Sequence, residues 1–119
     1  MYEYTATLVS VHDADSLRLD VDLGFDIHHA SLDVRLLGID CPELRREDGR
    51  GEIALSYVVA WFAEHRGPYV VRTTKDRTEK FGRMLATVTA ADGAALIEDL
   101  LAAGMAKPYS GRGPRPTWP

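Results

Sequence analysis

The feature that most constrains the fold is a strict alternation of apolar and polar residues in the first quarter of the chain. Leucine or valine occupies every second position from residue 17 to residue 23, and Arg18, Asp20 and Asp22 fill the positions between them. A period of two places all the apolar side chains on one face of an extended strand, so we predict a half-buried β-strand here. The fold is therefore expected to contain a sheet with one buried face.

Further strands and helices are predicted along the rest of the chain. The other strands are expected in β-branched or apolar stretches between turn-forming residues, at residues 2–11, 31–37, 69–73 and 85–89. Apolar residues at helical spacing predict helices over residues 52–65 and 94–103. Five short strands with a helix between the third and the fourth favour a mainly β fold with helices (α+β), in which a Greek-key barrel of the oligonucleotide-binding (OB-fold) type is capped by two helices.

The length of the chain and the composition of its C-terminal segment indicate one domain followed by a tail. With 119 residues, the chain can bury one hydrophobic core but is too short for two. The segment after Tyr109 is rich in glycine and proline, which is typical of a chain without regular structure. We therefore predict a folded domain at residues 1–109 and a tail at residues 110–119.

Three features favour a cytoplasmic protein without membrane association. No apolar stretch approaches the roughly 20 residues that span a bilayer. The first ten residues lack the basic region and apolar stretch of a signal peptide. The single cysteine, Cys41, excludes an internal disulfide and fits a reducing compartment.

Charge is distributed unevenly along the chain. The formal net charge is −4, and residues 1–43 contain nine acidic but only two basic residues. This balance is unfavourable for binding nucleic acid, whose affinity for a protein usually comes from neutralised phosphates. Either the carboxylates form a solvated acidic surface, or some of them converge on a metal ion that supplies the missing positive charge.

The residues that could carry chemistry lie in three blocks at the ends of predicted strands. These blocks are Asp13-Ala14-Asp15-Ser16, the segment from Arg35 to Glu43, and Glu79-Lys80-Phe81-Gly82-Arg83. Asp15 and Asp40 offer the hard oxygen ligands that Ca²⁺ or Mg²⁺ prefers. Alternation places Arg35 on the opposite face of its strand from Leu36, and an arginine on a barrel strand requires an anionic partner such as a phosphate.

Together these residues satisfy the requirements for cleaving a phosphodiester bond. Hydrolysis requires a base near the attacking water, a positive charge that polarises the phosphoryl oxygen, and donors for the transition-state charge. Glu43 could act as the base, a metal on Asp15 and Asp40 could polarise the phosphate, and Arg35 and Arg83 could act as the donors.

The three blocks resemble the motifs of the staphylococcal (micrococcal) nuclease family, whose members are also called thermonucleases. The family pattern is Asp-Gly-Asp-Thr, then Arg-Leu…Asp-x-Pro-Glu, then Asp-x-Tyr-Gly-Arg, and finally a helix end Leu…Gly-Leu-Ala. The chain matches these blocks in order with Asp13 to Ser16, Arg35 to Glu43, Glu79 to Arg83, and Leu100 to Ala106. The resemblance extends from about Tyr4 to Tyr109.

The resemblance implies a five-stranded barrel and a metal site. Asp15 and Asp40 would be calcium-binding carboxylates, and the backbone carbonyl of Cys41 would be a third ligand. The preference for calcium rests on the resemblance, because the residues themselves permit Mg²⁺ or another divalent ion. Asp13 would lie at the rim of this site.

The resemblance also implies roles for the remaining residues and a class of substrate. Glu43 would orient or deprotonate the attacking water, while Arg35 and Arg83 would hold the phosphate and stabilise the transition state. The residues expected to bind substrate are Lys80, Phe81 and Tyr109. The predicted function is that of a calcium-dependent endonuclease that cuts DNA, RNA or both with little sequence preference.

Departures from the family pattern leave a second function open. Ala14 replaces a glycine and would strain the turn if that position needs a positive φ. Phe81 replaces a tyrosine, which removes a hydrogen bond to phosphate but keeps a surface for stacking bases. Arg35 could instead form a structural ion pair with Asp33 or Glu43, and Arg83 could be a surface charge. The alternative function is a non-catalytic barrel that binds nucleic acid or protein. The sequence does not indicate an oligomeric state.

Overall fold

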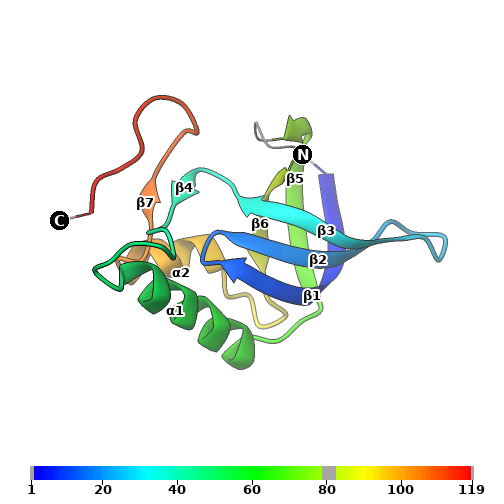
Figure 1. The fold of residues 1–119 in the computed structure, drawn as a ribbon. Helices are drawn as coiled ribbons and strands as arrows, with labels where there is room; N and C mark the ends of the chain where they lie inside the picture. The colour runs from blue at the N-terminus through cyan, green and yellow to red at the C-terminus, as the bar shows by residue number, and fades with distance from the viewer. Residues whose placement is uncertain (1, 79–82, 119) are drawn as a thin grey trace.

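The structure is a computed structural model that describes residues 2–78 and 83–118, and its central feature is a closed barrel (Figure 1). The barrel strands follow one another around the barrel in the order β1 (Tyr2–Asp13), β2 (Ser16–Asp22), β3 (His28–Leu36), β6 (Met84–Thr89) and β5 (Tyr69–Thr78). Neighbouring strands are antiparallel except β3 and β6, which pair in parallel and close the barrel. The predicted five-stranded barrel in an α+β fold is confirmed.

The alternating segment forms β2 as predicted. Leu17, Leu19 and Val21 are buried in the barrel, whereas Arg18 is exposed. The alternation ends one position earlier than the sequence suggests, because β2 stops at Asp22 and Leu23 is exposed. The sheet face that the sequence pattern buries is therefore the inside of the barrel.

Beyond β2 the chain forms a long hairpin that reaches away from the barrel (Figure 1). Its tip is closed by backbone hydrogen bonds between Leu23 and Ile27 and between Ile27 and Gly24. Phe25 and Asp26 at the tip have φ angles of 54° and 59°, which side-chain-bearing residues rarely adopt. The next strand begins at His28, earlier than the predicted residue 31, because the hairpin continues the pairing of β2 with β3.

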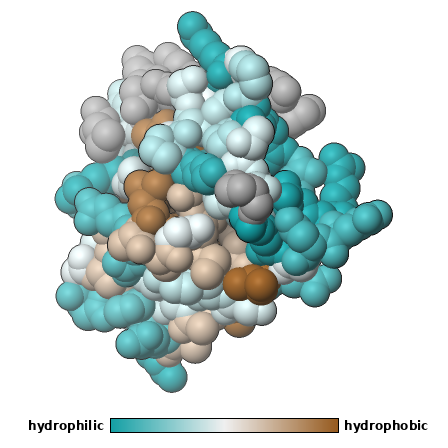
Figure 2. Space-filling model, turned by 90° about the vertical axis from the view of Figure 1, so that its left-hand side faces the viewer, coloured by the Kyte–Doolittle hydropathy of each residue, from teal (hydrophilic) through white to brown (hydrophobic). Residues whose placement is uncertain are grey.

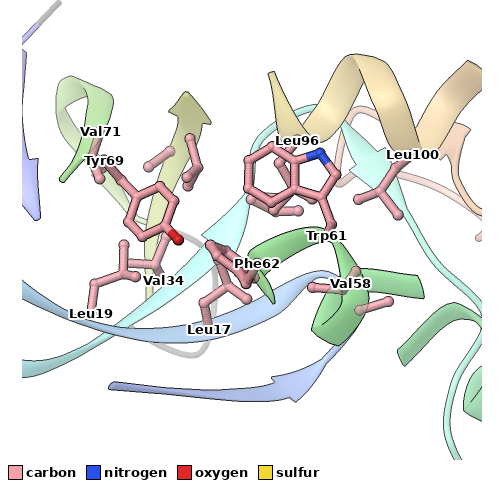
Figure 3. Packing of buried hydrophobic residues seen from close by; sticks show 14 of the residues in the cluster. Leu17, Leu19, Val34, Val58, Trp61, Phe62, Tyr69, Val71, Leu96 and Leu100 are labelled. Carbon is pink, nitrogen blue, oxygen red and sulfur yellow. The ribbon is translucent and has the colours of Figure 1, made fainter. Parts of the chain in front are cut away.

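Two helices pack against the barrel, close to where they were predicted. They are α1 (Arg50–Glu64) and α2 (Leu96–Ala102), and they contact each other as well as the barrel strands. From α1, Trp61 and Phe62 pack edge to face with a ring-centroid distance of 5.0 Å, and Phe62 in turn contacts Tyr69 of β5 in the core (Figure 3). Neither of these helices is both long and apolar enough to cross a membrane.

The structure differs from the sequence-based prediction at two places near the ends of strands. The strand β5 continues to Thr78, into a segment predicted to be a loop. A second, two-stranded sheet pairs β4 (Ile39–Asp40) with β7 (Lys107–Pro108), where the sequence predicted no strand. Two-residue strands are too short to produce a detectable period, which is why the sequence did not predict this sheet. The sheet holds the segment just before the C-terminal tail beside Asp40.

Candidate active site

A cleft of about 1210 Å³ lies where the β1–β2 turn, the end of β3, the start of β6 and the C-terminal tail meet. Predicted site residues from all these segments line it, namely Asp13, Asp15, Arg35, Cys41, Glu43, Arg83 and Tyr109. Asp40 is 1% exposed and contacts Arg35 and Arg115, both of which line the cleft. The side of the molecule that carries the tail has a mostly hydrophilic surface with small apolar patches (Figure 2).

The β1–β2 turn places the carboxylate of Asp15 at the cleft. Asp13 and Ser16 pair across the turn, and the backbone N–H of Leu36 donates to the carbonyl of Asp15 at 2.9 Å. Ala14 is buried in this turn and does not have a positive φ. The strain that the loss of glycine could have caused is therefore absent, and alanine is accommodated.

The Asp15 side chain is buried and carries a destabilised negative charge. It is 4% exposed, it accepts a hydrogen bond from the backbone N–H of Cys41 at 3.0 Å, and it forms an ion pair with Arg35 at 3.1 Å. Burial raises the pKa of Asp15 more than these two partners lower it, and the negative charge of Asp40 raises it further. An additional cation near Asp15 would stabilise its ionised form.

Arg35 holds the two predicted metal-binding carboxylates together. The strand β3 buries Val34 and Leu36 inside the barrel, so Arg35 points outward, as the alternation predicted. Its guanidinium contacts Asp15 through Nη1 and Asp40 through Nη2, each at 3.1 Å. Asp33, a partner that the sequence left open for Arg35, pairs with Arg18 instead.

The predicted metal ligands form a small set. Among residues 2–78 and 83–118, no three His, Cys, Asp or Glu side chains are grouped to hold a metal ion. The acidic side chains that Arg35 joins are Asp15 and Asp40, and the third predicted ligand is the backbone carbonyl of Cys41. An ion bound here would need ligands from the backbone, from water or from substrate to complete its shell.

Cys41 contributes its backbone rather than its thiol. The side chain is buried, and this burial, followed by the negative charges of Asp15 and Asp40, raises the pKa of the Cys41 thiol. A thiol in this environment stays protonated and is a poor nucleophile. The environment of Cys41 therefore disfavours chemistry by its sulfur.

Glu43 is an acid of the cleft that is more exposed than the buried Asp15 and Asp40. It accepts a hydrogen bond from Nε of Arg45 at 2.9 Å and forms an ion pair with Arg115. The hydrogen bond from Arg45, together with the charge and hydrogen bond of Arg115, lowers the pKa of Glu43. Its carboxylate is therefore ionised at neutral pH.

The backbone of Glu43 is held in place by a close approach of α1. A Cβ atom added to Gly51 would lie 2.0 Å from the Glu43 carbonyl oxygen, far inside van der Waals contact. Only glycine permits this packing between the helix and the loop.

Arg83 reaches the cleft from the start of β6. The parallel pairing of β3 with β6 aligns Arg35 with Leu85, which brings the segment of Arg83 to the same end of the barrel. Nη1 of Arg83 donates to Oγ of Ser16 at 2.6 Å, beside the β1–β2 turn. Both predicted phosphate-binding arginines thus line one cleft.

The predicted substrate-binding residues are only partly covered by the structure. Tyr109 lines the cleft, and its hydroxyl donates to the carbonyl of Gly113 at 3.0 Å. Lys80 and Phe81 lie outside the described residues.

The residue that sequence reasoning missed is Arg115. Its guanidinium contacts Asp40 at 2.7 Å and also pairs with Glu43. It belongs to a Gly- and Pro-rich tail, where arginines are normally solvated and no periodic pattern indicates a contact. The predicted boundary after residue 109 separates Tyr109 from Arg115, although both line the same cleft.

A comparison with protein-family models supports the resemblance found in the sequence. The model described as staphylococcal nuclease homologue matches residues 33–117, which is well over half of the chain. The chain belongs to the staphylococcal nuclease family. A search of curated proteins found no match. In this staphylococcal nuclease homologue, the match begins in β3 just before Arg35 and continues through Asp40, Glu43 and Arg83 into the tail.

Proposed function

We propose that the protein is a calcium-dependent endonuclease that hydrolyses phosphodiester bonds of DNA, RNA or both with little sequence preference. The observation that carries the proposal is the single Arg35 guanidinium that joins buried Asp15 to buried Asp40, in a cleft that Arg83 and Glu43 also line. Membership of the nuclease-type family supports the same chemistry.

The donor set of the cleft fits a divalent cation. Asp15 and Asp40 provide hard carboxylate oxygens in a protected position, and the raised pKa of Asp15 reflects a negative charge that an added cation would stabilise. Asp15, Asp40 and the backbone carbonyl of Cys41 would hold the ion. When bound, it would act as a Lewis acid toward a phosphoryl oxygen.

The other side chains supply proton transfer and charge stabilisation. Glu43 is ionised at neutral pH and lines the cleft, so it would orient or deprotonate the attacking water. Arg35 and Arg83 offer planar N–H donors that match the geometry of a phosphate, and they would stabilise the extra negative charge of the transition state. Tyr109 would contact the substrate at the tail side of the cleft.

The test is to incubate purified protein with supercoiled plasmid, single-stranded DNA and RNA, in calcium and then in a chelator. Cleavage in calcium that stops in the chelator supports the proposal. An Arg18→Ala variant is a matched control, because Arg18 pairs with Asp33 and does not line the cleft. Binding of nucleic acid without cleavage under Ca²⁺, Mg²⁺ or Mn²⁺ would instead support a non-catalytic binding module.

A further inference from the structure

The C-terminal tail inserts a positive charge among the acids of the cleft. Arg115 Nη2 lies 2.7 Å from Oδ1 of Asp40, and its Nη1 pairs with Oε1 of Glu43. The same Asp40 oxygen also accepts a hydrogen bond from Arg35 at 3.1 Å. A proposed metal ligand and the proposed base are thus joined by one guanidinium from a distant part of the sequence.

Contacts on both sides of Arg115 hold the tail in this position. Before it, β7 pairs with β4, and Tyr109 bonds to the carbonyls of Gly38 and Gly113. After it, Arg46 donates to the Trp118 carbonyl at 3.2 Å. The tail leaves β7, turns and comes back along the same end of the molecule (Figure 1).

Lys107 adds a second anchor near the end of the tail. Its Nζ donates to the carbonyl of Thr117 and lies 4.8 Å from the ring centroid of Trp118, within the range of a cation–π contact. These anchors use the backbone of Asp40 but neither the Asp40 nor the Glu43 carboxylate, so they hold the tail independently of the side-chain contacts of Arg115.

Arg115 is held less firmly than Arg35. The Arg115 side chain is 44% exposed, whereas that of Arg35 is 16% exposed. Ion pairs that reach solvent contribute little net stability, because water competes for both partners. Of the two arginines that contact Asp40, Arg115 is therefore the one that can leave at the lower cost.

We propose that Arg115 is a built-in competitor of the divalent cation, so that the tail keeps the site closed until metal displaces it. A calcium ion held by Asp40 Oδ1 would lie about 2.3 to 2.6 Å from the oxygen that the Arg115 guanidinium now contacts. Two positive groups on one carboxylate oxygen repel each other strongly in a partly buried site. A calcium ion on Asp40 Oδ1 would therefore displace Arg115 from it. This inference rests on the metal site of the proposed function.

The experiment measures calcium affinity by isothermal titration calorimetry on the full chain and on two variants that lose the same charge. Arg115→Ala should bind calcium about three- to tenfold more tightly, the scale expected for losing its two partly exposed ion pairs, with Asp40 and with Glu43. Arg112→Ala is the matched control, because Arg112 lies in the same tail and its described hydrogen bonds are made by its backbone with Ser110. It should stay within about twofold of the unmodified chain.

A second measurement follows the tail without reference to activity. The Nε–H signal of Arg115 in NMR spectra should shift on calcium addition in the unmodified chain, because its guanidinium then leaves the carboxylates of Asp40 and Glu43. An Arg115 signal that stays in place at saturating calcium would overturn the inference.

The outcomes separate failure of this inference from failure of the proposed function. Calcium binding of equal strength in the unmodified chain and Arg115→Ala would overturn the inference and leave the metal site standing. Reduced cleavage in Arg115→Ala at unchanged calcium affinity would overturn it as well, and would make Arg115 a substrate ligand. No calcium binding in either protein would refute the metal site and the competition together.

Discussion

Arg35 shows how much of the chemistry is decided by single side chains. Val34 and Leu36 point into the barrel, so Arg35 points into the cleft, where its single positive charge pairs with both Asp15 and Asp40. Removing it would leave two buried carboxylates without their shared partner, a change that is normally strongly destabilising. Loss of Arg35 would therefore confound catalysis with folding, and other residues give cleaner tests.

The cleaner residues for a test of catalysis are Glu43 and Arg83, which lie at the edge of the cleft. We expect Glu43→Gln or Arg83→Ala to lower kcat by at least about a hundredfold, the usual scale for a preorganised group that acts in the transition state. Glu43→Gln keeps the size of the side chain and removes its negative charge, and with it the base and the ion pairs with Arg45 and Arg115. Steady-state cleavage of a fluorogenic oligonucleotide measures the effect, with Arg18→Ala as the control. Unchanged turnover in both variants would contradict the roles proposed for them.

Asp40 gives a separate test of the metal site. Asp40→Asn keeps the shape of the side chain but removes the charge that a divalent cation needs, so calcium affinity should fall at least tenfold, equivalent to about 1.4 kcal/mol. Because Arg115 also contacts Asp40, the calorimetric titration is best repeated in the Arg115→Ala background. Identical calcium affinity with and without the Asp40 charge would exclude Asp40 as a ligand.

The sequence predicted most of the charged residues that the structure brings to the cleft. Asp15, Arg35, Asp40, Glu43 and Arg83 stand in short ordered motifs, and the structure brings all of them to one end of the barrel. Arg115 could not be predicted, because its place depends on tail contacts that have no local sequence pattern. The roles of these residues stay predictions until the assays are done.

The helix α1 covers the barrel, and its first turn also contacts the backbone of the segment that carries Glu43. Glycine to alanine in a helix usually stabilises a protein by about 0.5 to 1 kcal/mol. At Gly51 we expect the opposite sign, a loss of about 1 to 3 kcal/mol, because the new methyl group would collide with the Glu43 backbone. Urea unfolding measures the loss, and kcat should fall with it as Glu43 moves.

A control on the same helix separates helix propensity from the collision. Ser56 is exposed in the middle of α1, so Ser56→Ala reports helix propensity alone and should be neutral or slightly stabilising. If Gly51→Ala behaved like Ser56→Ala, the close approach of α1 to Glu43 would not constrain the loop.

The C-terminal end of α1 predicts a pH dependence of stability. Nδ1 of His65, the residue that caps α1, lies 2.6 Å from a carboxylate oxygen of Asp92 in the β6–α2 connection. The hydrogen bond with Asp92 raises the pKa of His65 above its ordinary value of 6.5. A raised histidine pKa means that the fold favours the protonated form. This contribution is fully present below pH 6.5 and is lost as the pH rises through the raised pKa.

The measurement compares the unmodified chain with His65→Gln in urea unfolding across pH 5.5 to 8.5. The stability difference between the two proteins should shrink as the pH rises, because glutamine does not titrate. A difference that stays constant with pH, or a His65 pKa at or below 6.5 in an NMR titration, would contradict this assignment.

The elements themselves were predicted with unequal success, for physical reasons. Long periodic segments such as β2 and α1 can be predicted from the sequence, because burial of one face requires apolar residues at a regular spacing. The two-residue strands β4 and β7 carry no repeat and form only because the folded chain brings Ile39 beside Pro108. The sequence did not predict the extension of β5 to Thr78, because the charged residues in this segment are typical of a loop.

At the scale of the whole molecule, the barrel brings together parts of the chain that are far apart in sequence. Asp15 comes from the β1–β2 turn, Asp40 from beyond β3, and Arg83 from the start of β6. Parallel pairing of β3 with β6 is the step that unites them, and it joins strands separated by α1 and β5. The sequence pattern predicted the strands and the barrel. It did not predict the parallel pairing of β3 with β6, because that pairing forms only when the barrel closes and no local pattern indicates it.

The hairpin between β2 and β3 gives a stability prediction that is independent of the site. Phe25 and Asp26 both adopt a positive φ. Phe25 is 99% exposed, so no burial of its ring offsets the backbone strain. The double variant Phe25→Asn, Asp26→Gly supplies the residues that such a turn prefers and should stabilise the protein by about 1 kcal/mol or more. Phe25→Ala, measured beside it in urea, removes the ring alone. A double variant no more stable than Phe25→Ala would show that the turn is not strained.

The same hairpin also offers a place to attach a reporter. Its tip lies at the opposite end of the molecule from the cleft, and no residue of the tip lines it (Figure 1). The chain's own thiol, Cys41, is buried and held protonated, so it would react slowly with a maleimide. A Phe25→Cys substitution would therefore give one selectively reactive position for a dye or a surface linker, and single molecules could be tethered there while the cleft stays open to a passing polynucleotide.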